Sequence, residues 1–587
     1  MRGAGARLGA ALSLRGHGPC LQTCLPGSNA RKSVGQCADA DCDGLMMSET
    51  FDYLIVGSGP AGCVLAKRLS EDAGISVCVL EAGGPDTSPY IRMPAGFVKM
   101  LDKPAFMDFF STEPMPSLAG RSLRIPQGRI VGGSSSINGL AYSRGQHQDF
   151  DDWAAWGNAG WSYREVLPYF KRSERRIGAA DERFRGRDGR LPVTNPDWSS
   201  DLCEAFIAVT GQHGIARNPD YNGATQDGAG YFQRIIEAGR RVSCADAFLR
   251  PALAGGQVQL KMRAQAQRLL FEGLRVTGVA YLQDGQLRQV HARREVLVCA
   301  GTINSPKLLQ LSGVGPAQAL QALGIAVLSH LPGVGQNLRD HYTVRMAARA
   351  RDVATLNEYS RGWRLGLETL KWLTGRPSIL GLSPSLVHVF CKTRPEINRA
   401  DIQVLFTPGS YKEGRSYVLD DHPGMSCGAR QQRPFSAGHV ALSSADPQAA
   451  PRVQPNYLSD PRDPPVLLAA LRLARQFLHS PGLSRYFHSE TLPGPQVQTD
   501  DEWLDFARRR GSTAYHLVGT CKMGSADDAM AVVDPQLRVR GLQQLRVVDA
   551  SVMPQVPSAN TMAATLMVAE KAADMIRGRA AAEPADV

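Results

Sequence analysis

The chain has no long run of apolar residues. Nowhere in its 587 residues do about 18 apolar residues follow one another, which is the length that a membrane-spanning helix needs. Apolar residues still make up 43% of the chain, and charged residues make up 21%. This balance is typical of a folded globular protein and excludes wholesale disorder. A spanning helix is not expected, whereas peripheral membrane contact stays open.

Metal-binding cysteine pairs and a basic stripe are also missing. The 12 cysteines form no Cys-x-x-Cys pair, so no metal site is expected. Cys63, Cys78 and Cys299 lie in apolar surroundings typical of buried thiols, which favours a reducing compartment. The net charge of +11 comes from scattered arginines, so the sequence predicts no nucleic-acid partner.

Residues 1–46 differ from the rest of the chain. They are rich in arginine, with no acidic residue before Asp39. Such a leader is typical of an organelle transit peptide, which would imply a mitochondrial location. The alternative that we favour places the true start at Met46 or Met47, with a cytoplasmic protein or one peripheral to the inner membrane.

A glycine-rich turn follows the first apolar segment. Residues 53–56 predict a buried parallel strand, and Gly57-Ser58-Gly59-Pro60-Ala61-Gly62 then opens a helix. A second apolar strand, residues 77–80, ends in Glu81, at the spacing where an acid binds the adenosine ribose. The alternative is a turn that only packs a helix on a sheet. The strand, helix, second strand and acid together indicate dinucleotide binding.

Three further segments carry small or polar residues next to predicted strands. Gly128–Asn138 combines paired glycines with three serines, and it can cradle phosphate or form only a serine-rich turn. Residues 258–261, 278–282 and 295–299 predict strands, and 307–311 predicts a helix with Pro306 in its first turn. Near the end, 545–549 predicts a strand, and a helix from Thr561 to Ile576 follows Asn560, a candidate N-cap.

These segments, in this order, resemble the glucose–methanol–choline oxidoreductase family, and its choline dehydrogenase-like branch in particular. The resemblance covers residues 51–578 and depends most on Gly128–Asn138, Gly301–Gly315 and Ala514–Gly524. It implies an α/β fold in which a discontinuous, doubly wound, Rossmann-like FAD-binding domain interleaves with an α+β substrate domain on an antiparallel sheet. We expect the first domain to comprise residues 47–150, 236–340 and 520–580, and the second to comprise 151–235 and 341–519.

The resemblance also implies how FAD binds. Gly57, Gly59 and Gly62 would lie at the pyrophosphate, with Glu81 on the ribose. Gly133, Asn138, Asp549, Ala550 and Thr561 would lie nearer the flavin. Relatives that attach FAD covalently do so through a histidine just before the equivalent of Asn138. Ile137 stands at that position here, so we expect non-covalent FAD.

His516 is the catalytic residue that the resemblance implies. A neutral imidazole can take the proton of an alcohol while hydride passes to flavin N5. Many relatives carry a second His or Asn where this chain has Met562. Either His516 acts alone, or Asn560 or a side chain of the substrate domain replaces the missing partner. Met562 favours bulky or hydrophobic alcohols over choline.

The expected function is oxidation of a primary alcohol, with electrons passed to a quinone or another carrier. An oxidase that uses O₂ and a redox-silent lyase on the same scaffold are the alternatives. Glu358, Tyr359 and Trp363 are candidates for a cage around a trimethylammonium group, or else ordinary loop and helix residues. The sequence indicates no oligomeric state.

Overall fold

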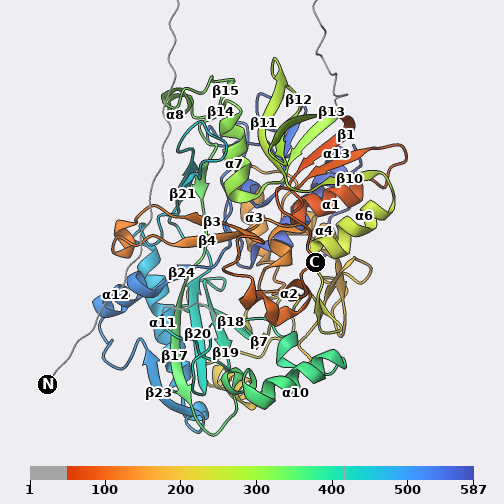
Figure 1. The fold of residues 1–587 in the computed structure, drawn as a ribbon. Helices are drawn as coiled ribbons and strands as arrows, with labels where there is room; N and C mark the ends of the chain where they lie inside the picture. Colours follow the sequence, from red (N-terminus) through yellow and green to blue (C-terminus); the bar gives the residue numbers. More distant parts are fainter. Residues whose placement is uncertain (1–48, 414–417) are drawn as a thin grey trace, which may run out of the picture. The chain divides into compact units, whose positions relative to one another are not determined.

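The computed structural model describes residues 49–413 and 418–587 (Figure 1). The predicted leader, residues 1–46, therefore lies outside the described residues. Within the described part, no helix is both long and apolar enough to cross a bilayer.

A seven-stranded sheet carries the turn at Gly57. Its order is β10-β2-β1-β13-β12-β11, and β25 pairs with β13 beside this path. Strands β10, β2, β1, β13 and β25 run parallel, whereas β11 and β12 are antiparallel. The sheet therefore joins strands from both ends of the chain. The bounds are β1 (Glu49–Val56), β2 (Val77–Leu80), β10 (Val258–Lys261), β11 (Ala264–Glu272), β12 (Arg275–Gln283), β13 (Gln286–Val298) and β25 (Leu545–Val547).

Helices pack on this sheet and on one another. Helix α1 (Pro60–Leu69) contacts α13 (Thr561–Ile576), and α13 also contacts α4 (Tyr163–Ser173). Helix α7 (Gly301–Leu311) packs on β11. The predicted strand 258–261 and the predicted helix 561–576 are confirmed with these bounds.

The helix predicted over 307–311 is wrong at its start, because α7 begins at Gly301 and contains Pro306. Proline has no N–H to donate to the carbonyl four residues earlier, which is that of Thr302. The Oγ1 of Thr520 donates to this carbonyl at 2.6 Å instead. A distant hydroxyl thus satisfies the group that would otherwise end the helix before the proline.

A second sheet has seven antiparallel strands in the order β23-β17-β20-β19-β18-β7, with β24 beside β17 (Figure 1). Helices α5 (Asp201–Gln212) and α11 (Asp463–Leu478) pack against it in a core of buried apolar side chains. The strands are β7 (Gly228–Tyr231), β17 (Tyr342–Ala350), β18 (Val387–Cys391), β19 (Ile402–Thr407), β20 (Gly424–Gln431), β23 (Phe487–Leu492) and β24 (Ser512–Thr513).

The fold class is therefore as predicted, with a discontinuous, doubly wound Rossmann-like domain interleaved with an α+β domain on an antiparallel sheet. The predicted residue boundaries of the two domains stay a prediction. The chain also forms shorter elements. They include η1 (Pro94–Lys99), β3 (Met107–Ser111), β4 (Arg124–Gly128), η3 (Gly133–Ser136), α9 (Leu356–Tyr359), α10 (Gly362–Leu373), η5 (Ile379–Gly381) and η7 (Ala550–Val552).

Candidate active site

A cavity of about 640 Å³ is lined by residues of both large sheets. Its volume falls in the range of small-molecule and cofactor sites. The lining begins at Val56 at the end of β1, includes Thr343 and Arg430 of the antiparallel sheet, and ends at Thr565 in α13. Ten of the predicted cofactor residues line this cavity, and so do His516 and Asn560. The ten are Gly57, Gly59, Pro60, Ala61, Glu81, Gly133, Asn138, Asp549, Ala550 and Thr561.

The first turn of α1 opens into the cavity. Gly59 is the N-cap of the helix, which has no side-chain cap and no acidic residue in its first turn. A Cβ built on Gly59 would meet nothing within 4 Å, whereas one on Gly62 would lie 2.0 Å from the carbonyl oxygen of Gly57. The helix N–H groups are thus open to an anion, and Gly62 lets the turn pack closely.

Glu81 and Ser58 form one unit at this end of the cavity. One carboxylate oxygen of Glu81 accepts hydrogen bonds from the N–H and the hydroxyl of Ser58, at 3.0 and 2.6 Å. The other accepts from the N–H of Gly83 at 2.7 Å. Burial raises the pKa of Glu81, while these hydrogen bonds oppose the rise. Ser58 itself does not line the cavity and holds the acid in place from behind.

The segment around Gly133 closes over the same turn. Gly133 has a φ of +54°, and its Cβ would lie 2.7 Å from the Cα of Gly59, so only glycine fits there. Asn138 accepts a hydrogen bond from buried Arg241 at 2.6 Å and donates one to the Met562 sulfur at 3.3 Å. Its amide is therefore held at the cavity wall beside Met562.

Three more predicted cofactor residues, Asp549, Ala550 and Thr561, also line the cavity. The carboxylate of Asp549 accepts from the N–H and hydroxyl of Ser551, the hydroxyl of Ser305 and the N–H of Gly301. Asp549 thus joins β25, α7 and η7, and Ala550 follows it. Thr561 begins α13, which has no acidic residue in its first turn. The positive end of this helix faces the cavity.

These observations fit a dinucleotide cofactor. One uncapped helix start meets the space where a phosphate would lie, and a buried acid stands at the adjacent strand end. A second uncapped helix start lies farther along the same cavity. Ile137 lines the cavity next to Asn138, and its side chain has no atom that could form a covalent link.

Three side chains meet at buried His516; His341 and Arg430 are buried, and Asn560 is half-buried. Its Nδ1 lies 2.9 Å from Nδ1 of His341 and 3.3 Å from Nη1 of Arg430, and its Nε2 lies 2.9 Å from Nδ2 of Asn560. Antiparallel pairing of β17 with β24 places Tyr342 opposite Thr513, which brings the His341 and His516 segments together. Tyr515, with a φ of +64°, turns the backbone just before His516.

The hydrogen bonds determine the tautomer of each ring. The carbonyl oxygen of Gln432, 2.7 Å from Nε2 of His341, can only accept, so this Nε2 carries the hydrogen. Burial and the charge of Arg430 lower the pKa of both histidines well below 6.5, so both rings are neutral. His341 Nδ1 therefore accepts from His516 Nδ1. This leaves a lone pair on Nε2 of His516, facing Asn560.

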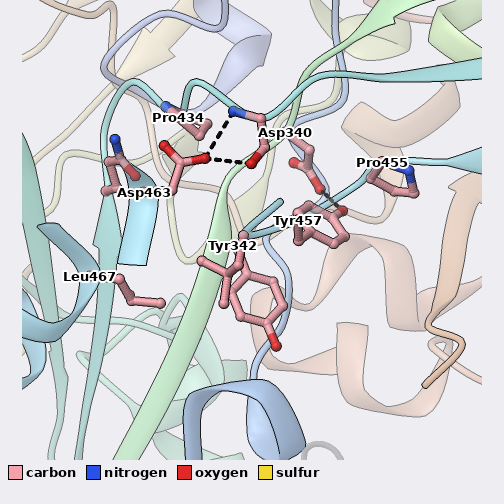
Figure 2. A pocket seen from close by; sticks show the side chains of 10 residues that line it. Asp340, Tyr342, Pro434, Pro455, Tyr457, Asp463 and Leu467 are labelled. Atoms are coloured by element: carbon pink, nitrogen blue, oxygen red, sulfur yellow. Dashed lines mark hydrogen bonds between the residues drawn. The ribbon is translucent and has the colours of Figure 1, made fainter. Parts of the chain in front are cut away.

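Asp340 supports this arrangement from behind. Its Oδ1 accepts from the backbone N–H groups of His341 and His516 at 2.8 and 2.7 Å. Its Oδ2 accepts from the hydroxyls of Tyr457 and Thr513, both at 2.5 Å. Figure 2 shows Asp340 beside Tyr457 at a second, much smaller cavity. Burial raises the pKa of Asp340 to about 6, although all four hydrogen bonds favour the charged form.

Two results differ from the sequence-based expectations. His341, Asp340 and Arg430 belong to the cluster, yet no local motif marks them, because His341 and His516 are 175 residues apart in the chain. The candidate cage residues Glu358, Tyr359 and Trp363 do not line the cavity. Glu358 instead caps its own helix through Thr355, and the Trp363 side chain is 75% exposed.

The fold and the cavity together define an oxidoreductase of the dinucleotide-cofactor class. The comparison with known families identifies it further. Profiles described as GMC oxidoreductase match residues 51–343 and 434–569, so the chain belongs to the GMC oxidoreductase family and takes FAD as its cofactor.

Curated relatives and solved structures agree with this family. The chain is 41% identical over 529 residues to a protein named oxygen-dependent choline dehydrogenase from Sinorhizobium fredii, covering 90% of this chain and 96% of the relative. It is 40% identical to one of the same name from Brucella ovis, with the same coverage. It is also similar to the crystal structure of pyridoxine 4-oxidase from Mesorbium loti, with a TM-score of 0.82, 30% identity and coverage of 90% and 100%.

Proposed function

We propose that this protein oxidises a primary alcohol to an aldehyde, with His516 as the general base. The observation that carries the proposal is the hydrogen-bond chain from Gln432 through His341 to His516, which leaves Nε2 of His516 unprotonated at the cavity. A neutral, oriented imidazole is the group that such a proton transfer requires.

The reaction balances as the loss of one proton and one hydride. The O–H bond of the alcohol breaks, and its proton passes to Nε2 of His516. The adjacent C–H bond breaks with its electron pair while the C=O bond of the aldehyde forms. FAD supplies the acceptor for these two electrons. His516 then holds the proton as an imidazolium, and its neighbour Arg430 opposes that charge and favours its release.

We propose that Asn560 is the second polar residue beside the base, a role that the Met562 side chain cannot take. Its Nδ2 reaches Nε2 of His516, and its Oδ1 has no hydrogen-bond partner among the described residues. As the N-cap of α13 it uses no side-chain cap bond, which leaves its amide free for the site. We propose that this amide holds the substrate hydroxyl beside the base.

We further propose roles for the cofactor residues. The α1 turn of Gly57, Gly59 and Gly62 would hold the pyrophosphate, and Glu81 would hold the ribose. Gly133, Asn138, Asp549 and Ala550 would line the flavin region. The helix start at Thr561 would stabilise negative charge there. FAD would bind non-covalently, because Ile137 offers no linking atom.

The electron acceptor is proposed to be a quinone or another carrier, with O₂ as the alternative. The relatives' printed name, oxygen-dependent choline dehydrogenase, supports testing O₂ as well as carriers. A redox-silent lyase is the alternative of a different class, and it would leave the flavin oxidised with every alcohol.

The deciding experiment is anaerobic bleaching of the flavin absorbance by a panel of alcohols. Wild type, His516→Ala and Asn560→Ala are compared, with the exposed His488→Ala as the matched control. Bleaching that is lost in His516→Ala and retained in His488→Ala is expected. Bound flavin that no alcohol reduces would contradict alcohol oxidation. Turnover like wild type in Asn560→Ala would remove Asn560 from the mechanism.

A further inference from the structure

Arg430 is a buried cation whose charge has no carboxylate partner. It lies on β20, is 3% exposed and lines the cavity beside His516. Its Nη1 lies 3.3 Å from Nδ1 of His516, which carries a hydrogen in the tautomer given above and cannot accept, and its Nε and Nη2 have no hydrogen-bond partner among the described residues. A buried guanidinium normally pairs with a carboxylate or phosphate, because leaving its N–H groups unbonded is costly.

The acids around the cavity are already engaged elsewhere. Glu81 is bonded to Ser58 and Gly83, and Asp108 lies 3.4 Å from Arg129. Asp549 is bonded to two serines and to the N–H of Gly301. The nearby carboxylate of Asp340 accepts four hydrogen bonds, none of them from Arg430. None of these carboxylates is hydrogen-bonded to Arg430, although the charge of Asp340 lies close enough to favour the protonated form of that guanidinium.

Other polar groups share the face of the sheet that carries Arg430. Register pairing places Thr343 of β17 and Gln403 of β19 directly opposite it, so the three side chains project from the same face. The buried Oγ1 of Thr343 and both amide atoms of Gln403 also have no partner among the described residues. Thr343 and Arg430 both line the cavity, so this hydroxyl and the unpaired guanidinium can bind a carboxylate there, whereas Gln403 shares the face of the sheet without lining the cavity.

From these contacts we infer that the alcohol substrate carries a carboxylate, which Arg430 binds together with Thr343. This inference rests on the proposed function. Because Arg430 and Asn560 contact opposite nitrogens of the same imidazole, the carboxylate and the reacting carbon are only a few bonds apart. The substrate class is therefore a short ω-hydroxy acid. A quaternary ammonium alcohol such as choline would be repelled by Arg430.

The test compares charged and uncharged alcohols in anaerobic flavin reduction. Glycolate, 3-hydroxypropionate and 4-hydroxybutyrate are measured against 1-propanol, 1-butanol and choline. Wild type is expected to prefer one of the hydroxy acids. Arg430→Gln is expected to lower kcat/KM for that acid about 10²-fold or more and to change the uncharged alcohols only a few-fold at pH 8. Arg430→Lys should lie between. Arg349→Gln, an exposed arginine of β17 outside the cavity, is the control.

A binding measurement separates recognition from catalysis. Butyrate cannot be oxidised at a hydroxyl, and it should perturb the flavin spectrum of wild type but not of Arg430→Gln, whereas butyramide should perturb neither. Equal losses for acids and uncharged alcohols would assign Arg430 to the base and overturn the inference. So would a wild-type preference for choline. If no alcohol reduces the flavin, the proposed function itself fails instead.

A second inference rests on α10, which is independent of the cavity. Its side chains Trp363, Leu367, Leu370 and Leu373 are 75%, 45%, 59% and 69% exposed. Their spacing of three and four residues places them on one face. The buried side chain of this helix is polar Glu368, which is bonded to Lys371 and to the N–H of Ile379. The helix therefore presents its apolar face outward.

Basic residues flank this face. Arg364 and Lys371 lie about two turns apart on one side of the apolar stripe. Arg376 is exposed just beyond the end of α10. Glu368 is the acidic residue of the helix, and Lys371 neutralises it. An apolar stripe with tryptophan and basic flanks is typical of a helix that lies in a membrane interface.

We propose that α10 docks on a bilayer surface that carries anionic lipids. The holoenzyme is sedimented with phosphatidylcholine vesicles with and without phosphatidylglycerol. Binding that needs phosphatidylglycerol and weakens with salt is expected. Replacing Leu367, Leu370 and Leu373 by Gln should weaken it by about tenfold for each leucine.

The matched control is Leu287→Gln, which removes a leucine 66% exposed in β13 and should bind as wild type does. Turnover with a soluble acceptor should stay unchanged in the triple variant, which shows that it folds. Binding that the triple variant retains would overturn the proposal. So would a dimer in sedimentation velocity that the triple variant abolishes, because α10 would then face a second copy.

Discussion

At the scale of single residues, the tautomer of His516 depends on His341. If His341 is replaced by Phe, the hydrogen on Nδ1 of His516 loses its acceptor, and the ring is free to present either nitrogen to the substrate. We expect flavin reduction to slow by about 10²-fold or more, in the range of general-base effects. Stopped-flow absorbance under anaerobic conditions measures this rate. An unchanged rate, with flavin content equal to wild type, would show that His341 does not orient the base.

The environment of His516 also predicts the dependence of flavin reduction on pH. Burial and Arg430 lower its pKa well below 6.5, so the ring stays neutral as the pH falls from 8 to 6.5. The rate constant should therefore be flat over that range and fall only at lower pH. Arg430→Gln removes one cause of the shift, so its acid limb should move to higher pH. A wild-type rate that already falls near pH 7 would contradict this account.

Asp340 provides a stability prediction at the same scale. In Asp340→Asn, the amide nitrogen takes the place of one carboxylate oxygen. This nitrogen can only donate, but the groups around it are also donors, so a buried hydrogen bond is lost. We expect a destabilisation of roughly 2–3 kcal/mol, as for hydrogen bonds to a charged group. Chemical denaturation of the holoenzyme measures it. Thr513→Ser, which keeps the hydroxyl bonded to Asp340, is the control and should cost less.

At the scale of elements, Gly133 should be needed for the contact between η3 and the α1 turn. Gly133→Ala places a Cβ 2.7 Å from the Cα of Gly59 at a φ of +54°, so either the turn or η3 must move. We expect reduced FAD content after purification. Gly273→Ala is the matched control, because Gly273 has a φ of +60° with nothing within 4 Å of its Cβ and does not line the cavity. Equal FAD loss in both variants would assign the effect to backbone strain alone.

Local patterns predicted the elements that bind the cofactor, but not the catalytic cluster. Apolar runs and glycine spacing identified β1, α1 and β2, since these features depend on neighbouring residues. The start of α7 was missed because the hydroxyl of Thr520, 218 residues away, satisfies the carbonyl of Thr302. Arg430 and His341 were missed for a similar reason. Their positions beside His516 follow from strand register, which a single sequence does not show.

At the scale of the whole molecule, the cavity joins parts of the chain that are far apart. Its lining includes residues from Val56 to Thr565 and from both large sheets. FAD bound there would contact segments of both sheets at once. Binding of FAD should therefore stabilise the fold as a unit, not only the α1 turn.

This coupling gives the last prediction. A ligand that binds only the folded state stabilises it by RT ln(1 + [L]/Kd), which is about 2.7 kcal/mol at 100 times Kd. The Tm of FAD-stripped protein should thus rise with added FAD, and one transition should report both sheets. ADP, which fills only the α1 end of the cavity, is the control; it should bind more weakly than FAD and therefore raise Tm less at the same free concentration. If ADP restores the full Tm, the flavin end of the cavity adds nothing to stability. If FAD raises one transition and leaves another unchanged, the two sheets unfold independently and the cavity does not couple them.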